Sequence, residues 1–334
     1  MSADSDSLVL SKREPDDGYS YNRSSHPSQE TVEWQLCKLY NVPYDEPRGG
    51  CCLSSSGMNA ISNTLQALLN TGEYGMIAYG SELYCDTPRT IDFWAKQYRV
   101  QTRAIPVQSS AEMLATMEQL KGQAIILLVE ACSNPSGHVF DFGLLPKLRQ
   151  TCRRLTVVVD NTWLTSIICN PLDLGADIVV TSLTKYYSAG SCIAGAILTR
   201  NARFAKDILQ LVHQTGMHVS PHHCDLILQA LPTLEERVRK ASDVTVQLLL
   251  DSPPCMQQIS HPFLPNHPSH ALAQRYFTKG VYPSVLQSRR ALIFGVKMHC
   301  APVKTCSKNY PSVGGKLSHL VRASMHRQFF CSRL

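Results

Sequence analysis

Two short apolar runs, each followed by a chemically active side chain, constrain the fold of this chain more than any other feature. Residues 155–159 and 178–180 are rich in β-branched side chains and show no alternation of polar and apolar positions. Such runs are typical of parallel strands buried on both faces of a sheet. Asp160 follows the first run, and Lys185 comes shortly after the second. Because ligands bind beyond the carboxyl ends of parallel strands, we expect this carboxylate and this amine to face one crevice.

Strand-end carboxylates and surface lysines occur in any α/β protein, so the spacing alone favours no function. The surrounding sequence, however, resembles the signature of the pyridoxal-phosphate enzymes of cysteine and methionine metabolism, the group of cystathionine γ-synthase, cystathionine lyase and methionine γ-lyase. In that family the pattern is approximately D-x-T-F/W, then P-L-x-x-G-A-D, then S-x-T-K-Y. The matching residues here are Asp160, Thr162, Trp163, Pro171, Leu172, Gly175, Ala176, Asp177, Ser182, Thr184, Lys185 and Tyr186.

The resemblance implies an α/β fold of the aspartate-aminotransferase-like kind (fold type I) and the cofactor pyridoxal 5'-phosphate. A mostly parallel sheet would carry the cofactor, and a smaller C-terminal α/β domain would follow. Lys185 would form a Schiff base with the cofactor and later move the Cα proton of the substrate. Asp160 would pair with the pyridine nitrogen and favour its protonated form, which makes the ring an electron sink.

The resemblance also assigns residues to the cofactor phosphate. Residues 55–61 reproduce the family's S-S-G-M-x-A-I at the start of a helical pattern. A Ser/Gly-rich turn entering a helix presents backbone N–H groups to an anion, although an ordinary serine cap would look the same. The amides of Gly57 and Met58 are therefore assigned to the phosphate. The resemblance also places Ser182 and Thr184 among the cofactor-binding residues.

Two further loops resemble segments of the family that contact the cofactor ring. Tyr84 follows an expected strand at 76–79 and stands where the family stacks an aromatic ring on the pyridine. Its phenol can also exchange protons with substrate, so it joins Lys185 as a catalytic candidate. Asn134 follows an expected strand at 124–129 and would lie near the cofactor's phenolic oxygen, although Asn-Pro is also a common turn signal. Cys85 and Asp86 replace two small residues of the family, with an effect that the sequence leaves open.

Residues 19–33 resemble the family's Y-x-R-x-x-x-P-T segment, with Tyr21 and Arg23 at the matching positions. In the family this tyrosine and arginine reach across a dimer interface to the phosphate of the neighbouring subunit. The planar fork of arginine suits that task, because it can donate two hydrogen bonds to phosphate oxygens. The resemblance thus implies a homodimer or a homotetramer.

We divide the chain into an N-terminal arm and dimer-contact segment (1–45), a cofactor-binding large domain (46–237) and a reduced C-terminal domain (238–334). A helical pattern over 221–250, interrupted at Pro232, leads from the second to the third. Beyond about residue 270 the resemblance weakens. The family binds the substrate carboxylate with the arginine of L-x-R-L-S-V-G; Arg322 stands in a similar string but follows residues 312–315 too closely, so it does not receive this role. We therefore expect a divergent, shortened C-terminus and weak turnover.

Composition excludes several other classes of protein. With 44% hydrophobic and 17% charged residues, the chain resembles ordinary globular proteins. Its net charge of +6 is scattered, which gives no support to nucleic-acid binding. The 13 cysteines are odd in number, and the first residues lack the apolar core of a signal peptide. We expect a cytoplasmic protein with free thiols and no membrane segment. Neither Cys51-Cys52 nor residues 222–224 have zinc-site spacing, so no metal is expected.

The expected function is that of a pyridoxal-phosphate-dependent carbon–sulfur lyase or transferase. It would act on sulfur amino acids or activated homoserine by γ- or β-elimination or replacement. The alternative is a catalytically impaired relative that binds the cofactor and serves as a partner subunit. That alternative is favoured by residues 189–192, which read A-G-S-C where the family has G-H-S-D. The enzyme is favoured by the intact set Tyr84, Asp160, Ser182, Thr184 and Lys185.

Overall fold

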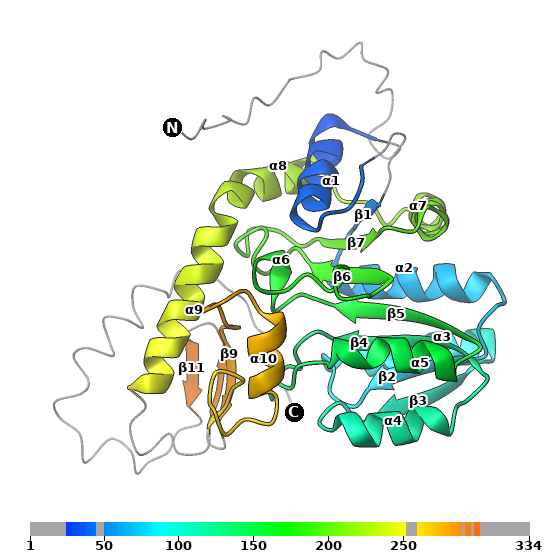
Figure 1. The fold of residues 1–334 in the computed structure, drawn as a ribbon. Coiled ribbons are helices and arrows are strands. Elements are labelled where there is room, and N and C mark those ends of the chain that lie inside the picture. Colours follow the sequence, from blue (N-terminus) through cyan, green and yellow to red (C-terminus); the bar gives the residue numbers. More distant parts are fainter. Residues whose placement is uncertain (1–24, 45–49, 252–258, 289–290, 295–296, 301–334) are drawn as a thin grey trace, which may run out of the picture.

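The computed structural model describes residues 25–44, 50–251, 259–288, 291–294 and 297–300, and is centred on a seven-stranded sheet (Figure 1). The strand order is β1-β7-β6-β5-β4-β2-β3. In this sheet only β7 runs against the others, because it pairs antiparallel with β1 and β6 while the other pairs are parallel. The expectation of a mostly parallel sheet is therefore confirmed. Its strands are β1 (Cys51–Ser54), β2 (Met76–Gly80), β3 (Gln101–Ile105), β4 (Ala124–Glu130), β5 (Arg154–Asp160), β6 (Ile178–Ser182) and β7 (Gly195–Thr199).

The apolar runs of the sequence are explained by burial on both faces of this sheet. All of β4 is buried. Its side chains alternate between two hydrophobic clusters: Ile126 and Leu128 belong to one, and Ile125 and Leu127 to the other. Because successive side chains of a strand point to opposite faces, a strand that is apolar at every position needs a layer of helices on each side.

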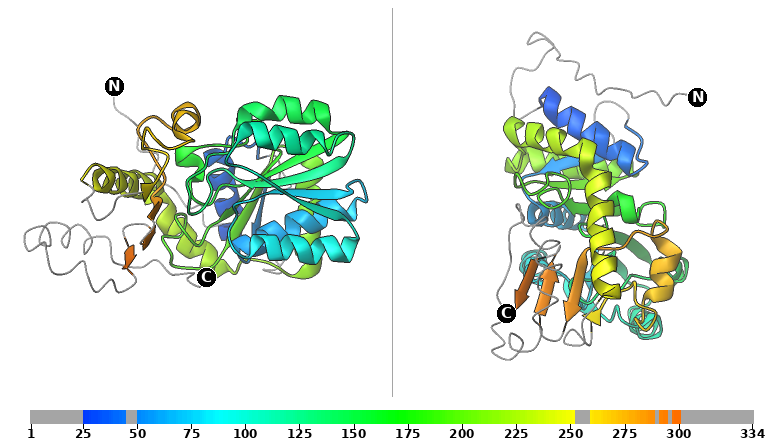
Figure 2. Two further views of the ribbon diagram at one scale, coloured as in Figure 1. Left: turned by 90° about the horizontal axis from the view of Figure 1, so that it is seen from below. Right: turned by 90° about the vertical axis from the view of Figure 1, so that its left-hand side faces the viewer.

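Helices supply both layers, as the left view of Figure 2 shows. One face is covered by α2 (Gly57–Asn70), α3 (Thr87–Tyr98) and α7 (Ala202–Thr215). The other is covered by α1 (Pro27–Leu39), α4 (Ser110–Glu118), α5 (Leu145–Thr151), α6 (Thr165–Ile168) and α8 (Pro221–Ala230), with a 3-10 turn, η1 (Phe142–Leu144), before α5. The molecule is thus the three-layer α/β sandwich that the sequence predicts.

The expected helix over residues 221–250 is interrupted where the sequence predicts. After α8 the chain forms a 3-10 turn at Leu231–Thr233 (η2), and α9 (Leu234–Leu250) continues beyond it. Pro232 lies in that turn. Proline interrupts the helix because it lacks the N–H of a helix interior and its ring clashes with the preceding turn. The predicted domain boundary at residue 238 falls inside α9. The division into domains stays a prediction.

A second, antiparallel sheet lies beside α9, in the order β11-β10-β9-β8 (Figure 1). Its strands are β8 (Ile259–Ser260), β9 (Val285–Ser288), β10 (Ala291–Phe294) and β11 (Lys297–Cys300), and α10 (His270–Tyr276) stands between β8 and β9. The strings at 312–315 and around Arg322, named in the sequence comparison, lie outside the described residues.

Two buried histidines fix the segment between β8 and β9. His261 accepts the N–H of Phe263 through Nδ1 (3.1 Å) and donates Nε2–H to the carbonyl of Pro283 (2.8 Å). His267 repeats the pattern, with Nδ1 accepting an N–H two residues ahead and Nε2 donating to Ser136 (3.0 Å). One nitrogen accepts and the other donates, which requires the neutral ring. Accordingly, burial lowers the pKa of His261 to about 4 and also lowers the pKa of His267.

Acidification should therefore destabilise the protein through His261. Between its usual pKa of 6.5 and its folded pKa of about 4, the unfolded chain binds more protons than the fold. The stabilisation is complete above pH 6.5 and falls by about 3 kcal/mol on acidification through pH 4. Urea unfolding of His261→Gln should show a weaker pH dependence than the wild type. His222→Gln, at an exposed position of α8, should keep the full dependence; equal slopes for both variants would contradict the assignment.

Candidate active site

The carboxyl ends of β4, β5 and β6 bring several predicted residues to one edge of the sheet. Glu130 of β4 is in register with Asp160 of β5, and Asp160 is in register with Val180 of β6. Ser182 ends β6 and Lys185 follows it in the next turn. Since parallel strands end at the same edge, the carboxylate and the lysine stand on the same side of the sheet, where ligands of such folds bind.

A short chain of hydrogen bonds connects Asp160 to the turn that carries Lys185. The N–H of Thr162 donates to Asp160 Oδ1 (2.9 Å), and Thr162 Oγ1 accepts the N–H of Ser182 (2.9 Å). The N–H of Lys185 then donates to the carbonyl of Ser182 (3.4 Å). Thr162 matches the family pattern but is absent from the predicted site residues. Its place in D-x-T is the signal that could have identified it as the connection between the carboxylate and the lysine.

The turn after β6 is held by Thr184, the neighbour of Lys185. Thr184 Oγ1 accepts the N–H of Ala194 (3.1 Å), and the N–H of Thr184 donates to the carbonyl of Ala194 (3.3 Å). β7 begins only at Gly195, because Ala194 pairs with the lysine turn instead of extending the strand. The side chain of Lys185 is partly buried.

Tyr186, directly after Lys185, anchors the same turn to the C-terminal part of the chain. It is buried, and burial raises the pKa of its phenol. Its hydroxyl is hydrogen-bonded to Ser284, and its carbonyl accepts from the guanidinium of Arg237 in α9. Lys185 is thus flanked by residues that are fixed on both sides.

The N-terminus of α2 packs directly against the ends of β6 and β7. Ser56 caps the helix, and its Oγ accepts the N–H of Asn59 (3.1 Å). A Cβ atom on Gly57 would lie 2.8 Å from the Cβ of Ser182, and a Cβ on Gly195 would lie 2.3 Å from the carbonyl oxygen of Ser56. Both distances are below those of real contacts. The close approach of the helix end to the sheet therefore depends on two glycines.

The N-terminus of α2 and the ends of β6 and β7 that pack against it form a cradle that suits an anion such as a phosphate. The first N–H groups of a helix have no partner within the helix, and its dipole favours negative charge. Gly57 and Met58 are the first residues of α2, as the assignment of their amides to the phosphate requires. Met58 also packs on the cluster that covers this face of the sheet. Phosphate binding by these two amides stays a prediction.

Glu130, to which the sequence assigns no role, stands between the two loops predicted to contact the cofactor ring. Its Oε1 accepts the N–H of Tyr84 (2.6 Å), and its Oε2 accepts the N–H of Asn134 (2.9 Å). Tyr84 and Asn134 thereby lie on either side of one carboxylate, which is next to Asp160 in the sheet. A carboxylate that ends a buried strand beside the strand of Asp160 is the signal that could have found it. The contacts of Tyr84 and Asn134 with the ring stay predictions.

The two neighbouring carboxyl groups have strongly perturbed acidity. Burial raises the pKa of Asp160, and hydrogen bonds from Thr162 oppose that effect. Burial also raises the pKa of Glu130, and the charge of Asp160 adds to it. Within the described part of the chain, neither carboxyl forms an ion pair. Because a buried charge is costly without a partner, a cation such as a protonated pyridine nitrogen fits the place beside Asp160.

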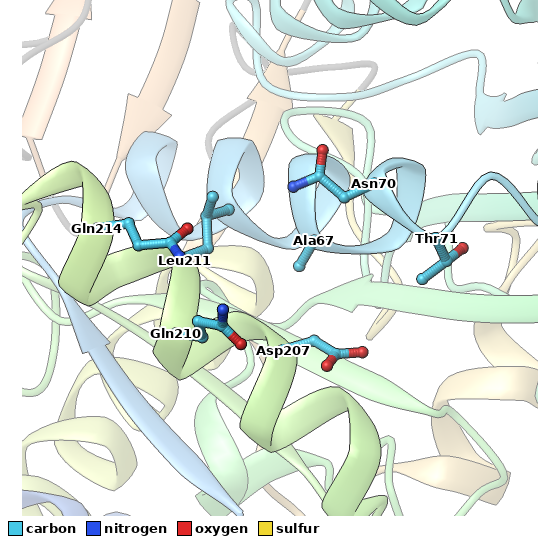
Figure 3. Close-up of a pocket in the computed structure, with 7 residues that line it drawn as sticks. All are labelled: Ala67, Asn70, Thr71, Asp207, Gln210, Leu211 and Gln214. Carbon is cyan, nitrogen blue, oxygen red and sulfur yellow. The ribbon is translucent and has the colours of Figure 1, made fainter.

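A separate hollow lies on the outer surface between α2 and α7 (Figure 3). Its volume is about 290 Å³, and its lining is mostly polar: Ala67, Asn70, Thr71, Asp207, Gln210, Leu211 and Gln214. It lies at the C-terminal end of α2, whereas the cradle lies at the N-terminus of that helix. At about 1.5 Å per residue, the two are roughly 15 to 20 Å apart. The hollow is thus not part of the candidate active site.

Other expectations concern metals, membranes and the N-terminal arm. Where the structure describes the chain, no three His, Cys, Asp or Glu side chains are grouped to hold a metal ion. No helix of the described ranges combines the length and apolarity needed to cross a bilayer. Six buried cysteines are free thiols: Cys51, Cys132, Cys152, Cys169, Cys192 and Cys224. Tyr21 and Arg23 lie outside the described residues, so their contact with a neighbouring subunit stays a prediction.

A three-layer α/β fold with a lysine, a partly buried carboxylate and a helix N-terminus at the carboxyl edge of its sheet defines a pyridoxal-phosphate protein of fold type I. Residues 2–298 match the family of Cys/Met metabolism PLP-dependent enzymes, and the chain belongs to that family. PLP is pyridoxal 5'-phosphate, the cofactor that the sequence predicts.

Curated relatives and solved structures agree with this membership. The chain is 32% identical to L-methionine gamma-lyase of Pseudomonas deceptionensis, over 77% of this chain and 63% of the relative. It is 26% identical to cystathionine beta-lyase of Schizosaccharomyces pombe, over 69% of this chain and 56% of the relative. The chain thus spans less than two thirds of the length of these relatives.

Among solved structures, the fold resembles a cystathionine gamma synthase from Xanthomonas oryzae pv. oryzae, solved in complex with aminoacrylate and cysteine. The TM-score is 0.70 at 26% identity, covering 84% of this chain and 71% of the other. The expected fold class is therefore correct. The alternative of a partner subunit without turnover finds no support in these relatives, whose names are those of enzymes.

Proposed function

We propose that this chain is a pyridoxal-phosphate-dependent trans-sulfuration enzyme, a carbon–sulfur lyase or transferase. Its substrates would be sulfur amino acids or activated homoserine, converted by γ- or β-elimination or replacement. The observation that carries the proposal is the chain of hydrogen bonds that joins Asp160 through Thr162 and Ser182 to Lys185, beside the N-terminus of α2. The names of the relatives, methionine gamma-lyase and cystathionine beta-lyase, support the choice of substrate class.

In this proposal the residues of the chain divide the binding of the cofactor among them. Asp160 holds the pyridine nitrogen in its protonated form, Tyr84 lies against the ring and Asn134 lies near the phenolic oxygen. The phosphate is held by Gly57, Met58, Ser182 and Thr184. When bound, the cofactor supplies an electron sink for the electrons that remain at the substrate Cα.

Lys185 has two tasks in the proposed reaction. Its amine would hold the cofactor covalently, and the same amine would take the proton from the substrate Cα. A general base must lie within hydrogen-bond reach of the proton that it removes. Thr184 and Tyr186, which flank Lys185, are held by hydrogen bonds. They restrict the main chain of Lys185 and so favour a constant position of this residue. The phenol of Tyr84 is the second candidate for proton transfer.

We further propose a homodimer or homotetramer in the cytoplasm. The grounds for the oligomer are the match of Tyr21 and Arg23 to the family's intersubunit segment and the prevalence of closed, symmetric assemblies. The ground for the compartment is the odd number of cysteines, which favours free thiols. Sedimentation of the holoprotein tests the first point: a pure monomer with full cofactor affinity would contradict it.

The proposed function is tested with purified protein and pyridoxal phosphate. We expect an absorbance band near the visible edge that borohydride removes. Cystathionine, methionine, cysteine and O-acylated homoserine are then supplied, and keto acid, ammonia and cystathionine are measured. Product from at least one substrate supports the proposal. Absence of the band would refute cofactor binding, whereas a band without any product would refute the proposed activity alone.

A further inference from the structure

Glu130 connects three parts of the candidate site that are far apart in the sequence. Tyr84 belongs to the loop after β2, Asn134 to the turn after β4, and Asp160 to the end of β5. One carboxyl oxygen of Glu130 takes the N–H of Tyr84 and the other takes the N–H of Asn134. Both donors are main-chain groups, so the carboxylate fixes the backbone of the two loops. The directions of the Tyr84 and Asn134 side chains follow from that backbone.

We propose that Glu130 is a positioning residue of the active site, which holds the loops of Tyr84 and Asn134 on either side of the cofactor ring. The inference rests on the proposed function, because it assigns the ring to these two residues. Glu130 acts through them and through its neighbour Asp160, with which it shares a register position in the sheet.

A carboxylate is the side chain that this position requires. It offers two acceptor oxygens and no donor, which matches two converging N–H groups. Glutamine has the same length but presents an NH₂ group to one of the two N–H donors. Aspartate keeps both oxygens on a side chain one methylene shorter. Each natural alternative therefore loses the contact with at least one of the two loops.

The surroundings of Glu130 indicate that its carboxylate serves to arrange the two loops more than to stabilise the fold. Glu130 is only 6% exposed, and burial and the charges of the Asp160 and Glu82 carboxyl groups raise its pKa. A buried carboxylate facing like charges contributes little to stability in general. What it supplies is a fixed arrangement of two loops that have no sequence proximity.

Glu82 provides a second connection between the same loops: it precedes Tyr84 in the first loop, and its partners follow Asn134 in the second. Its carboxylate is hydrogen-bonded to Ser136 and to His138 Nδ1 (3.1 Å), and it accepts from the side-chain amide of Gln108 (2.8 Å). These bonds lower the pKa of Glu82 to about 2, against the opposing effect of burial. The loops thus stay attached when Glu130 is altered, so its variants should fold and change the site locally.

The test compares the holoproteins of the wild type, Glu130→Gln and Glu130→Asp. Hydrogen exchange is measured for peptides that contain Tyr84 and Asn134. The circular dichroism of the bound cofactor is recorded, together with the pyridoxal phosphate concentration at half-saturation. For Glu130→Gln we expect exchange at one or both amides to rise roughly tenfold or more. The cofactor dichroism should weaken, and half-saturation should need roughly tenfold more pyridoxal phosphate.

Asp177→Asn is the matched control. Asp177 also accepts a main-chain N–H, that of Val157 (2.7 Å), but it lies before β6, at the opposite edge of the sheet. This variant should leave the cofactor dichroism, half-saturation and exchange at Tyr84 and Asn134 unchanged, even if its melting temperature falls.

The outcomes separate this inference from the proposed function. Wild-type protein without a cofactor band would refute both. A wild-type band together with unchanged dichroism and exchange in Glu130→Gln would overturn the positioning role alone. Should Glu130→Gln fail to fold, Glu130→Asp decides: it retains the charge, and wild-type dichroism and exchange in this variant would overturn the proposal.

Discussion

Replacing Lys185 with alanine should abolish the covalent attachment of pyridoxal phosphate and reduce turnover by roughly a thousandfold or more, because both a nucleophile and a general base are lost. The side chain follows β6 at the carboxyl edge of the sheet, close in sequence to Ser182 and linked through Thr162 to Asp160. The measurement is the absorbance spectrum of the purified holoprotein with and without borohydride. It is followed by steady-state kinetics on the substrate that the wild type uses best.

Lys206→Ala serves as the control for this variant. Lys206 is an exposed lysine of α7, one of the helices on the same face of the sheet as α2. Its loss should leave the band and the kinetics unchanged. The assignment of Lys185 is wrong if Lys185→Ala keeps the band, or if the borohydride-reduced peptide of the wild type contains a different lysine.

Gly195→Ala is expected to have the largest effect on stability at the site. The added Cβ would lie 2.3 Å from the carbonyl oxygen of Ser56 and 2.8 Å from the nitrogen of Gly57. These are main-chain atoms at the start of α2, and β7 cannot shift away from them easily, since Gly195 is paired with Ser54 on one side and Ser182 on the other. Overpacking of this kind costs about 3 kcal/mol. The displaced helix end should also bind the cofactor phosphate more weakly.

Gly75→Ala is the comparison for this substitution. No atom lies within 4 Å of a Cβ at Gly75, and its backbone is not in the left-handed region. Its unfolding free energy should change by less than about 0.5 kcal/mol. Urea unfolding and titration with pyridoxal phosphate test both variants. Equal stabilities and equal cofactor affinities for the two would show that the contact between α2 and β7 is looser than the structure indicates.

Much of the central sheet could be predicted from the sequence, because its strands are buried on both faces. Apolar runs without alternation mark β2, β4, β5 and β6 within two residues of their ends. Pro232 marks the break between α8 and α9 for an equally local reason. The start of β7 has no such local signal, because it depends on the pairing of Ala194 with Thr184.

Helix α1 begins within residues 19–33, a polar segment that the sequence predicts to contact a partner subunit. Local signals nevertheless favour a helix from Pro27. Proline is favoured in the first turn of a helix, and His26 caps it by accepting the N–H of Gln29 (3.1 Å). Val32 and Leu36 then recur at helical spacing and are buried.

The site was predicted only in part, for a physical reason. Asp160 and Lys185 could be placed together because both follow buried strands, and parallel strands end at one edge. The roles of Glu130 and Gly195 could not be predicted, because these roles depend on contacts between segments far apart in the chain. Glu130 accepts two N–H groups from two different loops, and Gly195 allows the close approach of a helix that is distant in the sequence.

The hydrogen bond from His267 to the carbonyl of Ser136 couples two equilibria: the binding of the cofactor and the docking of the C-terminal segment (residues 259–288). Ser136 lies two residues after Asn134, and the same carbonyl also accepts the hydroxyl of Ser260 (2.6 Å). The turn predicted to face the cofactor is therefore also the surface on which the C-terminal segment docks. Whatever orders this turn lowers the cost of docking, and docking in turn favours ordering by the same free energy. Cofactor affinity and the attachment of the C-terminal segment should thus rise and fall together.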